Sequence, residues 1–322
     1  MFSENPLVSI VALCYNHEKY VIEALQSVVN QTYPNIELII VDDFSTDGSR
    51  EKISTFVKNH PSVQVIFNEK NIGNCKAFNR AFKISKGKYL IDLSTDDVML
   101  PNRVEEQVKL FESSDKIGVV FADADFIDEE SNFLKNIKDS YQLEPPIGDV
   151  YESILRGKAY VMPCSMMMRR SLLEQLGGYD ETLSYEDLDF WIRSARICEF
   201  GYVPQILAQQ RVLRGSHSTK SIMKNSILIQ SSVKICQKAY LLNKTEKEHE
   251  ALAVRLRMDL LRCALTENYQ AGEQALQLMK KLNKHNWKSR VAQFIIFFKI
   301  PINFLYVSVM TLRRLINFKT RY

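Results

Sequence analysis

The chain has 322 residues, of which 46% are hydrophobic and 25% are charged, with only 11 glycines and 9 prolines. This composition is typical of a folded globular protein and excludes collagen-like, disordered and low-complexity classes. The length suits one main domain with an additional segment. The six cysteines include no CxxC pair, so they predict neither a zinc site nor a disulfide framework, and they favour a reducing compartment.

Charge is distributed unevenly along the chain. The net charge is +4 overall, but the first 221 residues carry −8 and the remaining residues carry +12. No acidic residue follows Glu273, whereas ten lysines and arginines do. Such asymmetry predicts that the C-terminal region meets a polyanion, either nucleic acid or an anionic membrane. Residues Met1–Pro6 lack the basic and apolar regions of a secretory signal, so we expect the protein to stay in the cytoplasm.

Short apolar runs alternate with helical patterns in the first 126 residues. The predicted strands are Val8–Leu13, Ile36–Val41, Val63–Phe67, Tyr89–Leu93 and Ile117–Phe121. The helical patterns lie at Tyr20–Val29, Asp47–Val57 and Ala77–Ile84. The strands are apolar almost throughout, which indicates that both faces of their sheet are covered. This alternation predicts an α/β fold with a parallel sheet.

Acidic residues follow several of the predicted strands. They are Asp42 and Asp43 after the second run, Asp96 and Asp97 after the fourth, and Asp123 and Asp125 after the fifth. Because ligands of such sheets bind beyond the carboxyl ends of the strands, the pattern predicts a ring of carboxylates around a site. Oxygen ligands suit Mg²⁺ or Mn²⁺, which bridge to substrate phosphates. The residues leave open the alternative that these aspartates are ordinary loop and helix-capping residues.

The turn after the first run argues against one class of enzyme. It reads Cys14-Tyr15-Asn16-His17 and contains no G-x-G-x-x-G. The glycine turn that brings backbone amides to a pyrophosphate is therefore missing, which disfavours a dinucleotide-dependent oxidoreductase.

Five motifs, by their order and spacing, resemble those of the family 2 glycosyltransferases of GT-A fold. They are Val8-Ser9-Ile10-Val11 with Tyr15-Asn16, Val41 to Ser49, Asn71-Ile72-Gly73, Ser94-Thr95-Asp96-Asp97, and Tyr185 to Trp191. The resemblance covers about residues 6–221. It implies a Rossmann-like, mixed and mainly parallel sheet flanked by helices, a nucleotide-diphosphate sugar as donor, a divalent metal, and transfer with inversion.

The resemblance also implies which residues bind the donor. A nucleotide base needs a flat contact and an acceptor for its ring N–H, which Tyr15 and Asp42 could supply. Asn16 and Asp43 lie nearby for the base or the ribose. The other donor contacts that the resemblance implies are Asn71, Gly73, Asp96 and Arg211.

Two of these positions keep alternatives open. Gly73 could simply be a turn residue that needs a positive φ angle. Arg211 could reach the diphosphate or brace the acidic ring. The arginine that many relatives carry after the Asn71 turn is Phe78 here, with Arg80 two residues later.

Asp96 and Asp97 match the metal motif of the family. In that motif one carboxylate binds Mn²⁺ or Mg²⁺ and its neighbour commonly reaches the ribose or the sugar. The metal offsets the charge that develops on the leaving diphosphate. The usual D-x-D-D begins with Ser94 in this chain, which leaves open which aspartate holds the metal.

An inverting transfer needs a base that removes the proton of the acceptor hydroxyl. By resemblance Asp187 is the candidate base and Glu186 the fallback, whereas Asp189 and Trp191 support the start of a helix. The alternative is that the acids are first-turn residues favoured by the helix dipole.

The C-terminal region predicts helices and then a basic amphipathic tail. Residues 222–286 lose the strand pattern, and from residue 287 aromatic and aliphatic residues are flanked by arginines and lysines. Pro301 interrupts the apolar block, so interfacial seating on an anionic membrane fits better than a spanning helix. Packing on the protein's own core and a dimer interface remain alternatives. Nucleic acid is not expected, because polar base-reading side chains do not accompany the cations.

These features predict three regions. Residues 1–221 form a GT-A catalytic domain, with a nucleotide-sugar half at about 1–125 and an acceptor half at about 126–221. Residues 222–286 form a helical extension, and residues 287–322 form the membrane-associating tail. We expect an inverting, metal-dependent transferase of UDP-sugars that acts on a glycan or lipid-linked acceptor at the inner face of the membrane. The alternative is a non-catalytic nucleotide-sugar or glycan-binding subunit of a polysaccharide assembly.

Overall fold

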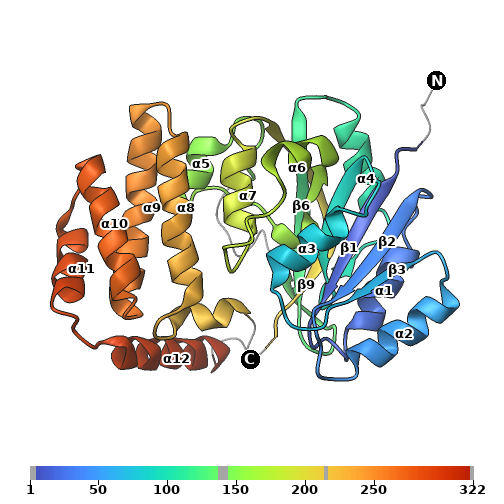
Figure 1. Cartoon of the computed structure of the whole chain (residues 1–322), viewed down its shortest axis with the longest axis horizontal. Coiled ribbons are helices and arrows are strands. Elements are labelled where there is room, and N and C mark those ends of the chain that lie inside the picture. Colours follow the sequence, from blue (N-terminus) through green and yellow to red (C-terminus); the bar gives the residue numbers. More distant parts are fainter. Residues whose placement is uncertain (1–4, 137–143, 214–216, 320–322) are drawn as a thin grey trace. The chain divides into compact units, whose positions relative to one another are not determined.

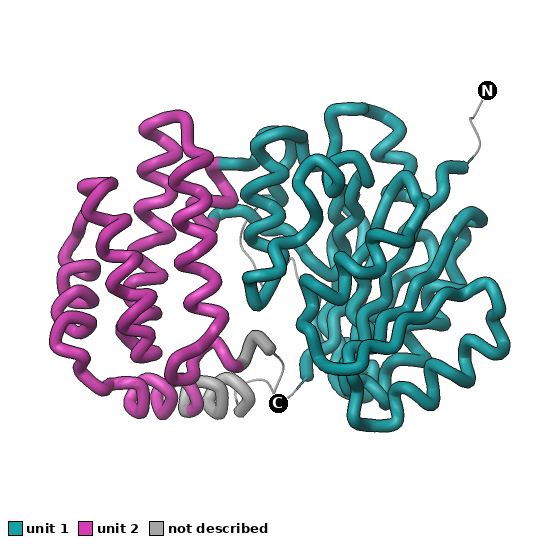
Figure 2. The backbone as a smooth tube through the Cα atoms, in the orientation of Figure 1, with its two compact units in different colours: residues 1–151, 158–213 teal, residues 152–157, 214–322 magenta. Residues whose placement is uncertain are grey.

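The structure is a computed structural model that describes residues 5–136, 144–213 and 217–319, without the side chains of 217–219 and 312–319. Figure 1 shows the course of the chain. The chain divides into two compact units, residues 1–151 with 158–213, and residues 152–157 with 214–322 (Figure 2).

The first unit is built on one sheet of nine strands (Figure 1). In spatial order the strands are β3 (Gln64–Phe67), β2 (Ile36–Asp42), β1 (Val8–Cys14), β4 (Tyr89–Ser94), β8 (Met167–Arg169), β6 (Ile117–Ile127), β9 (Glu199–Arg211) and β5 (Val98–Met99), and β7 (Phe133–Asn136) pairs with β6. Strands β3, β2, β1 and β4 are mutually parallel, whereas β8 and β5 run antiparallel to their neighbours. The expected mixed, mainly parallel sheet is therefore confirmed.

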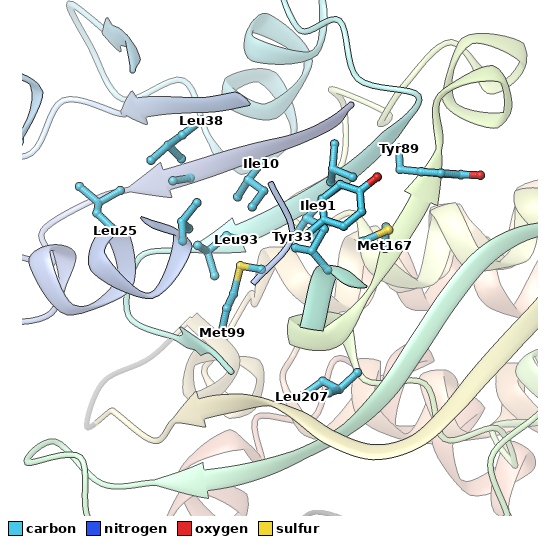
Figure 3. Close-up of a cluster of buried hydrophobic side chains, with 14 of the residues drawn as sticks. Ile10, Leu25, Tyr33, Leu38, Tyr89, Ile91, Leu93, Met99, Met167 and Leu207 are labelled. Atoms are coloured by element: carbon cyan, nitrogen blue, oxygen red, sulfur yellow. The ribbon is translucent and has the colours of Figure 1, made fainter. Parts of the chain in front are cut away.

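Helices cover both faces of this sheet. In chain order they are α1 (Val21–Val29), α2 (Ser49–Asn59), α3 (Asn74–Phe82), α4 (Arg103–Phe111), the start of α5 (Tyr151–Arg156), the 3₁₀ turn η2 (Pro163–Ser165), α6 (Arg170–Leu176) and α7 (Asp187–Ser194). Alternate strand residues such as Ile10 and Ile40 join one core cluster with side chains of α1, α2 and α4 (Figure 3). The intervening Val11 and Ile39 are equally buried, since α3 packs on the other face of β1 and β2.

One strand is longer than the sequence predicted. The fifth run was expected to end at Phe121, which would place Asp123 and Asp125 beyond the strand, but β6 continues to Ile127. The reason is its long parallel pairing with β9, which only the folded chain provides. Asp123 accepts a hydrogen bond from the hydroxyl of Tyr202 (2.7 Å), and Asp125 accepts one from Asn136 (3.1 Å). Both aspartates are therefore strand residues, and the carboxylate ring is smaller than expected.

Helix α3 joins the two halves of the first unit. The side-chain amide of Asn79 donates to the carbonyl of Tyr179 (2.8 Å), and its oxygen accepts from the amide of the same residue (2.9 Å). The ring of Phe78 stacks on that of Tyr179, with centroids 4.3 Å apart. Phe78 is thus a core residue that helps to position the loop before α7.

The second unit is helical, so the expected helical extension is confirmed. Its elements are the short 3₁₀ helix η3 (His217–Ile222), α8 (Ile227–Leu242), α9 (Glu246–Leu265), α10 (Tyr269–Leu282), α11 (Trp287–Phe297) and α12 (Asn303–Lys319). Helix α9 packs against α8, α10 and α11, and a capping box of Thr245 and Glu248 starts it. Residues 152–157 join this unit because Arg255 donates to the carbonyls of Ile154 (2.6 Å) and Leu155 (2.9 Å). The chain finally enters the unit after Leu213, earlier than residue 221, because η3 packs on α8 and α12.

The expected tail begins with a helix that is apolar on two sides. Ser289, Ala292 and Ile296 form the buried stripe of α11. A second stripe, which we call the outer stripe, consists of Trp287, Val291, Phe294 and Phe298 and is exposed. The expected tail cations lie partly outside the described part of the chain. The structure does not describe the side chains of Arg313, Arg314 and Lys319, and Arg321 lies beyond the described residues. Among the described residues, no helix is both long and apolar enough to cross a membrane.

Candidate functional site

The carboxyl ends of three parallel strands meet at one edge of the sheet. In the register, Cys14 of β1 lies beside Asp42 of β2, and Leu13 lies beside Ser94 of β4. The amide of Asp43 donates to the carbonyl of Cys14 (2.8 Å), and the amide of Thr95 donates to that of Leu13 (3.0 Å). The loops that follow these strands, which carry most of the predicted donor residues, are therefore neighbours.

The loop after β1 presents an exposed aromatic ring. Tyr15 is 46% exposed, and Asn16 next to it has a positive φ angle of 58°. The amide of Asn16 donates to the hydroxyl of Ser45 (2.9 Å), while its side-chain oxygen accepts from the amide of Thr46 (2.8 Å). Asn16 thus fastens the first loop to the second and leaves Tyr15 free to contact a ligand.

Asp42 is fully buried beneath these loops. Its Oδ1 accepts from the amide of Ser45 (3.1 Å) and from Nε of Arg50 (2.6 Å). Its Oδ2 has no hydrogen-bond partner among the residues that the structure describes. A buried carboxylate oxygen without a donor is costly, so this atom is available to an N–H donor that can reach it.

Asp43 organises the Asn71–Gly73 turn. Its carboxylate accepts from the amides of Ile72 (2.9 Å) and Gly73 (2.8 Å) and from the side-chain amide of Asn68 (2.8 Å). Gly73 has a φ of 85°, a conformation that favours glycine, and it is the N-cap of α3. Asn71 is exposed in this turn. Both oxygens of Asp43 are therefore committed to positioning the turn.

The sequence did not indicate Asn68, which follows β3 and is buried. Besides contacting Asp43, its side-chain oxygen accepts from Nη1 of Arg80 (2.5 Å), and its carbonyl accepts from Nη2 of Arg50. A single asparagine with no motif around it carries no recognisable signal. Its role follows only from the pairing of β2 with β3.

The Asp96-Asp97 pair lies beyond β4. Asp97 is buried and accepts a hydrogen bond from the amide of Arg211 (2.9 Å). Burial raises the pKa of Asp97 well above its usual value, and the charge of Asp96 raises it further. The side chain of Asp96 is partly exposed, accepts from the hydroxyl of Ser94, and lies 3.9 Å from Nδ1 of His17. Two adjacent carboxylates of this kind suit a bound cation.

Arg211 is the brace of this edge. Its guanidinium is buried, and Nε donates to the carbonyl of Asp96 (2.9 Å) while Nη2 pairs with Glu23 (2.6 Å). Nη1 donates to the carbonyl of Asp128 (2.8 Å) and to the hydroxyl of Ser131 (2.9 Å). Of the two roles left open by the sequence, these contacts match the bracing role.

Glu186 and Asp187 lie at the N-terminal end of α7. Glu186 accepts from the side-chain amide of Asn74 (2.8 Å), the first residue of α3, so the Asp43-bound turn and α7 are linked. Burial raises the pKa of Glu186 to about 7, and the charge of Asp187 contributes. Burial and the charge of Glu186 also raise the pKa of Asp92 on β4. The sequence did not single out Asp92, because it lies within a predicted strand.

Asp189 has the structural role that the sequence predicted. It is buried and pairs with Nε of Arg193 (2.7 Å). Arg193 in turn donates to the carbonyls of Leu176 (2.9 Å) and Gly178 (3.0 Å), which close the end of α6. Asp189 therefore supports the loop that carries Glu186 and is not itself directed to a ligand.

Asp96 and Asp97 are the carboxylates that could hold a divalent metal at this edge of the sheet. In the described ranges, no three or more His, Cys, Asp or Glu side chains group closely enough to enclose an ion. Mg²⁺, however, usually takes only one or two carboxylates together with substrate phosphates and water. Asp96 and Asp97 fit an ion whose coordination is completed by a diphosphate.

Comparison with known proteins gives one consistent family. The family model described as glycosyl transferase family 2 matches residues 9–177. An uncharacterized glycosyltransferase of Methanocaldococcus jannaschii is 32% identical over 228 residues, covering 70% of this chain and 77% of the relative. One of Rickettsia typhi is 31% identical over 215 residues, covering 65% of this chain and 64% of the relative.

Solved structures of low identity share the fold. S. aureus TarS 1-349 in complex with UDP-GlcNAc superposes with a TM-score of 0.68 at 17% identity, covering 95% of this chain and 92% of that one. The mannosyltransferase PcManGT from Pyrobaculum calidifontis, in complex with GDP-Man and Mn²⁺, has a TM-score of 0.59 at 16% identity, covering 96% and 87%. The GT-A fold and the resemblance inferred from the motifs are confirmed.

The raised pKa of Glu186 gives a pH-dependent stability. Between the ordinary value of 4.5 and about 7, the unfolded chain has lost a proton that the folded protein still holds. The free energy of unfolding of the wild type therefore falls as pH rises through this window. Glu186→Gln does not titrate, so its stability relative to the wild type should increase from about pH 4.5 to 7 and then level off. Denaturant unfolding at several pH values, with the exposed Glu51→Gln as control, measures this; a pH-independent difference would contradict it.

Proposed function

Because this chain belongs to glycosyl transferase family 2, we propose that it transfers a sugar from a nucleotide-diphosphate donor, UDP-linked, to a hydroxyl of a glycan or lipid-linked acceptor with inversion. The observation that carries the donor assignment is the unpartnered Oδ2 of buried Asp42 beside the exposed ring of Tyr15. A nucleobase offers a planar surface and a ring N–H, and these two groups match both. Asn16 fastens the loop of Tyr15 to the loop after β2, Asp43 positions the turn after β3, and Asn71 is exposed in that turn.

The diphosphate of the donor needs positive charge, and the nearby arginines have other partners. Arg211 is buried among protein acceptors, Arg50 pairs with Asp42, and Arg80 contacts Asn68. Asp97 and Asp96 are therefore proposed to hold Mn²⁺ or Mg²⁺. When bound, the ion would neutralise the charge that develops on the leaving diphosphate. Ser94 in place of the first aspartate lowers the number of fixed carboxylates, and it supplies a hydroxyl that orients Asp96.

The metal proposal predicts the effect of an isosteric change. Asp97→Asn removes the charge but retains an oxygen for the amide of Arg211, so the fold should remain. Release of nucleotide diphosphate from UDP-sugars should fall about 10²-fold or more, as when a charge-stabilising group is lost. Asp115→Asn, an exposed loop aspartate, is the matched control.

Removal of metal by a chelator tests the proposed metal-dependent transferase against the alternative of a non-catalytic binding subunit. With excess EDTA the wild type should release no nucleotide diphosphate, and added Mn²⁺ should restore release. Full activity in EDTA would exclude the metal assignment. A wild type that binds UDP-sugar but never hydrolyses or transfers it would instead be the non-catalytic binding subunit.

Asp187 is proposed as the base that takes the proton of the acceptor hydroxyl. Its support is the motif position at the start of α7 and the link from Asn74 to Glu186, which ties α7 to the donor-side turn. Glu186 remains the fallback, since a pKa of about 7 also suits a general base.

Replacing each carboxylate by the corresponding amide shows which of the two acts as the base. Asp187→Asn should keep KM for the donor within a few-fold and lower kcat by about 10² or more, as loss of a general base does. Glu186→Gln should have the smaller effect and shift the acidic limb of the pH–rate profile. If Glu186→Gln loses turnover while Asp187→Asn stays active, the roles are reversed.

We further propose that α11 and α12 seat the protein on the cytoplasmic face of an anionic membrane. The outer stripe of α11 exposes Trp287 and Phe294, and α12 exposes Phe304 and Leu305. Lys288 and Arg290 are exposed on α11, Lys299 is exposed just after it, and Lys280 and Lys281 are exposed in the last turn of α10. At a lipid interface, buried aromatic side chains and nearby cations both contribute to the free energy of membrane binding. Each cation near an anionic surface contributes roughly 1 kcal/mol.

Point variants test this surface better than a truncation after Asn286, because Ala292 and Ile296 of α11 belong to the core of the helical unit. The double variant Phe294→Ser with Phe298→Ser should reduce sedimentation with phosphatidylserine vesicles several-fold without lowering the melting temperature. The matched control is Gln293→Ser, exposed on the same helix. Wild-type binding should weaken with salt, since charges are screened beyond about 8 Å at physiological ionic strength. Absence of vesicle binding at low salt would exclude the membrane role.

A further inference from the structure

Phe44 has an unusual backbone conformation at the donor edge. It directly follows Asp42 and Asp43, and its φ angle is 68°. Left-handed backbone is uncommon for residues other than glycine and asparagine, and it is a genuine outlier for a bulky aromatic residue. Such outliers cost folding free energy and concentrate at functional sites.

The loop of Phe44 is fixed to the loop of Tyr15. Before Phe44, the amide of Asp43 donates to the carbonyl of Cys14 (2.8 Å). After Phe44, the hydroxyl of Ser45 accepts from the amide of Asn16 (2.9 Å). Phe44 and Tyr15 therefore occupy matching positions in two loops tied on both sides. The two rings are 41% and 46% exposed.

The ring of Phe44 is supported from within the protein. The guanidinium carbon of Arg50 lies 5.4 Å from the ring centroid of Phe44 and equally 5.4 Å from that of Phe67. Arg50 is itself held by Asp42 and by the carbonyl of Asn68. An exposed aromatic side chain with a fixed arginine beside it is a rigid surface and not a mobile loop tip.

The third observation is the polar group beneath this surface. Asp42 is fully buried, and its Oδ2 has no partner in the part of the chain that the structure describes. The loops of Tyr15 and Phe44 begin just after Cys14 and Asp42, which are paired in the sheet, so a planar ligand at these loops would lie near this carboxylate.

We propose that Phe44 is a further contact for the donor nucleobase, a second aromatic surface beside Tyr15. This inference rests on the proposed nucleotide-sugar donor. The strained conformation is retained because it brings a planar side chain to the edge of the base, where a glycine would leave open space. Stacking on an aromatic ring serves any base, whereas the buried acceptor Asp42 selects a base with a ring N–H, such as uracil or guanine.

The test uses two changes at Phe44 that separate strain from contact. Phe44→Gly removes both, so the melting temperature should rise or stay unchanged while UDP binding with Mn²⁺ weakens about tenfold, the size of a lost stacking contact. Phe44→Leu keeps the bulk and the strain but loses the planar ring, so UDP binding should weaken without a gain in stability. Asn283→Gly is the control, because it relieves a positive φ of 50° in the helical unit and should leave UDP binding unchanged.

Titration calorimetry with UDP and GDP gives distinct outcomes. If the wild type binds neither nucleotide, the proposed donor and the role of Phe44 both fail. If the wild type binds UDP and Phe44→Gly binds it equally well, the role of Phe44 fails and the donor assignment stands. If Phe44→Gly lowers the melting temperature together with the affinity, Phe44 is a structural residue and the inference is overturned.

Discussion

The carboxylate of Asp43 is the interaction on which the site depends. It accepts hydrogen bonds from Asn68 at the end of β3 and from the amides of Ile72 and Gly73 before α3. Without it, the buried amide of Asn68 would lose a partner, at a cost of about 1–3 kcal/mol, and two partly buried backbone amides would lose theirs. Because Asn74 of the same helix donates to Glu186, this carboxylate also helps to position the start of α7.

Electrostatics explain why so many acids can share one edge. Asp42 and Asp97 each have an arginine beside them, Arg50 and Arg211, whose donors are directed to protein oxygens. These contacts stabilise the carboxylates individually but leave the edge acidic as a whole. Burial is the main cause of the raised pKa values of Asp92, Asp97 and Glu186, and the charge of a neighbouring carboxylate raises each of them further. A divalent cation bound together with an anionic donor, as proposed, would offset this charge, so that metal binding and donor binding would favour each other.

The sequence could predict the elements whose signals are local. Apolar runs gave β1, β2 and β4 nearly to the residue, because a strand covered on both faces is apolar throughout. The extent of β6 could not be predicted, since its end depends on pairing with β9 about eighty residues later. Residues such as Asn68 and Asp92 were missed for the same reason. Motifs identify side chains that meet ligands, whereas the groups that position them are recognised only when distant segments come together.

Three unfavourable features lie at the edge where the loops after β1, β2 and β4 meet. They are the positive φ angle of Phe44, the unpartnered Oδ2 of Asp42 and the like-charged pair Asp96 and Asp97. Such features are not confined to this edge, since in the helical unit Asn283 has a positive φ angle and the buried hydroxyl of Ser226 has no partner among the described residues. What distinguishes the edge is that an unpartnered acceptor, an exposed aromatic ring and a carboxylate pair occur on neighbouring strand ends and loops, which is the arrangement that the proposed nucleotide, diphosphate and metal would need.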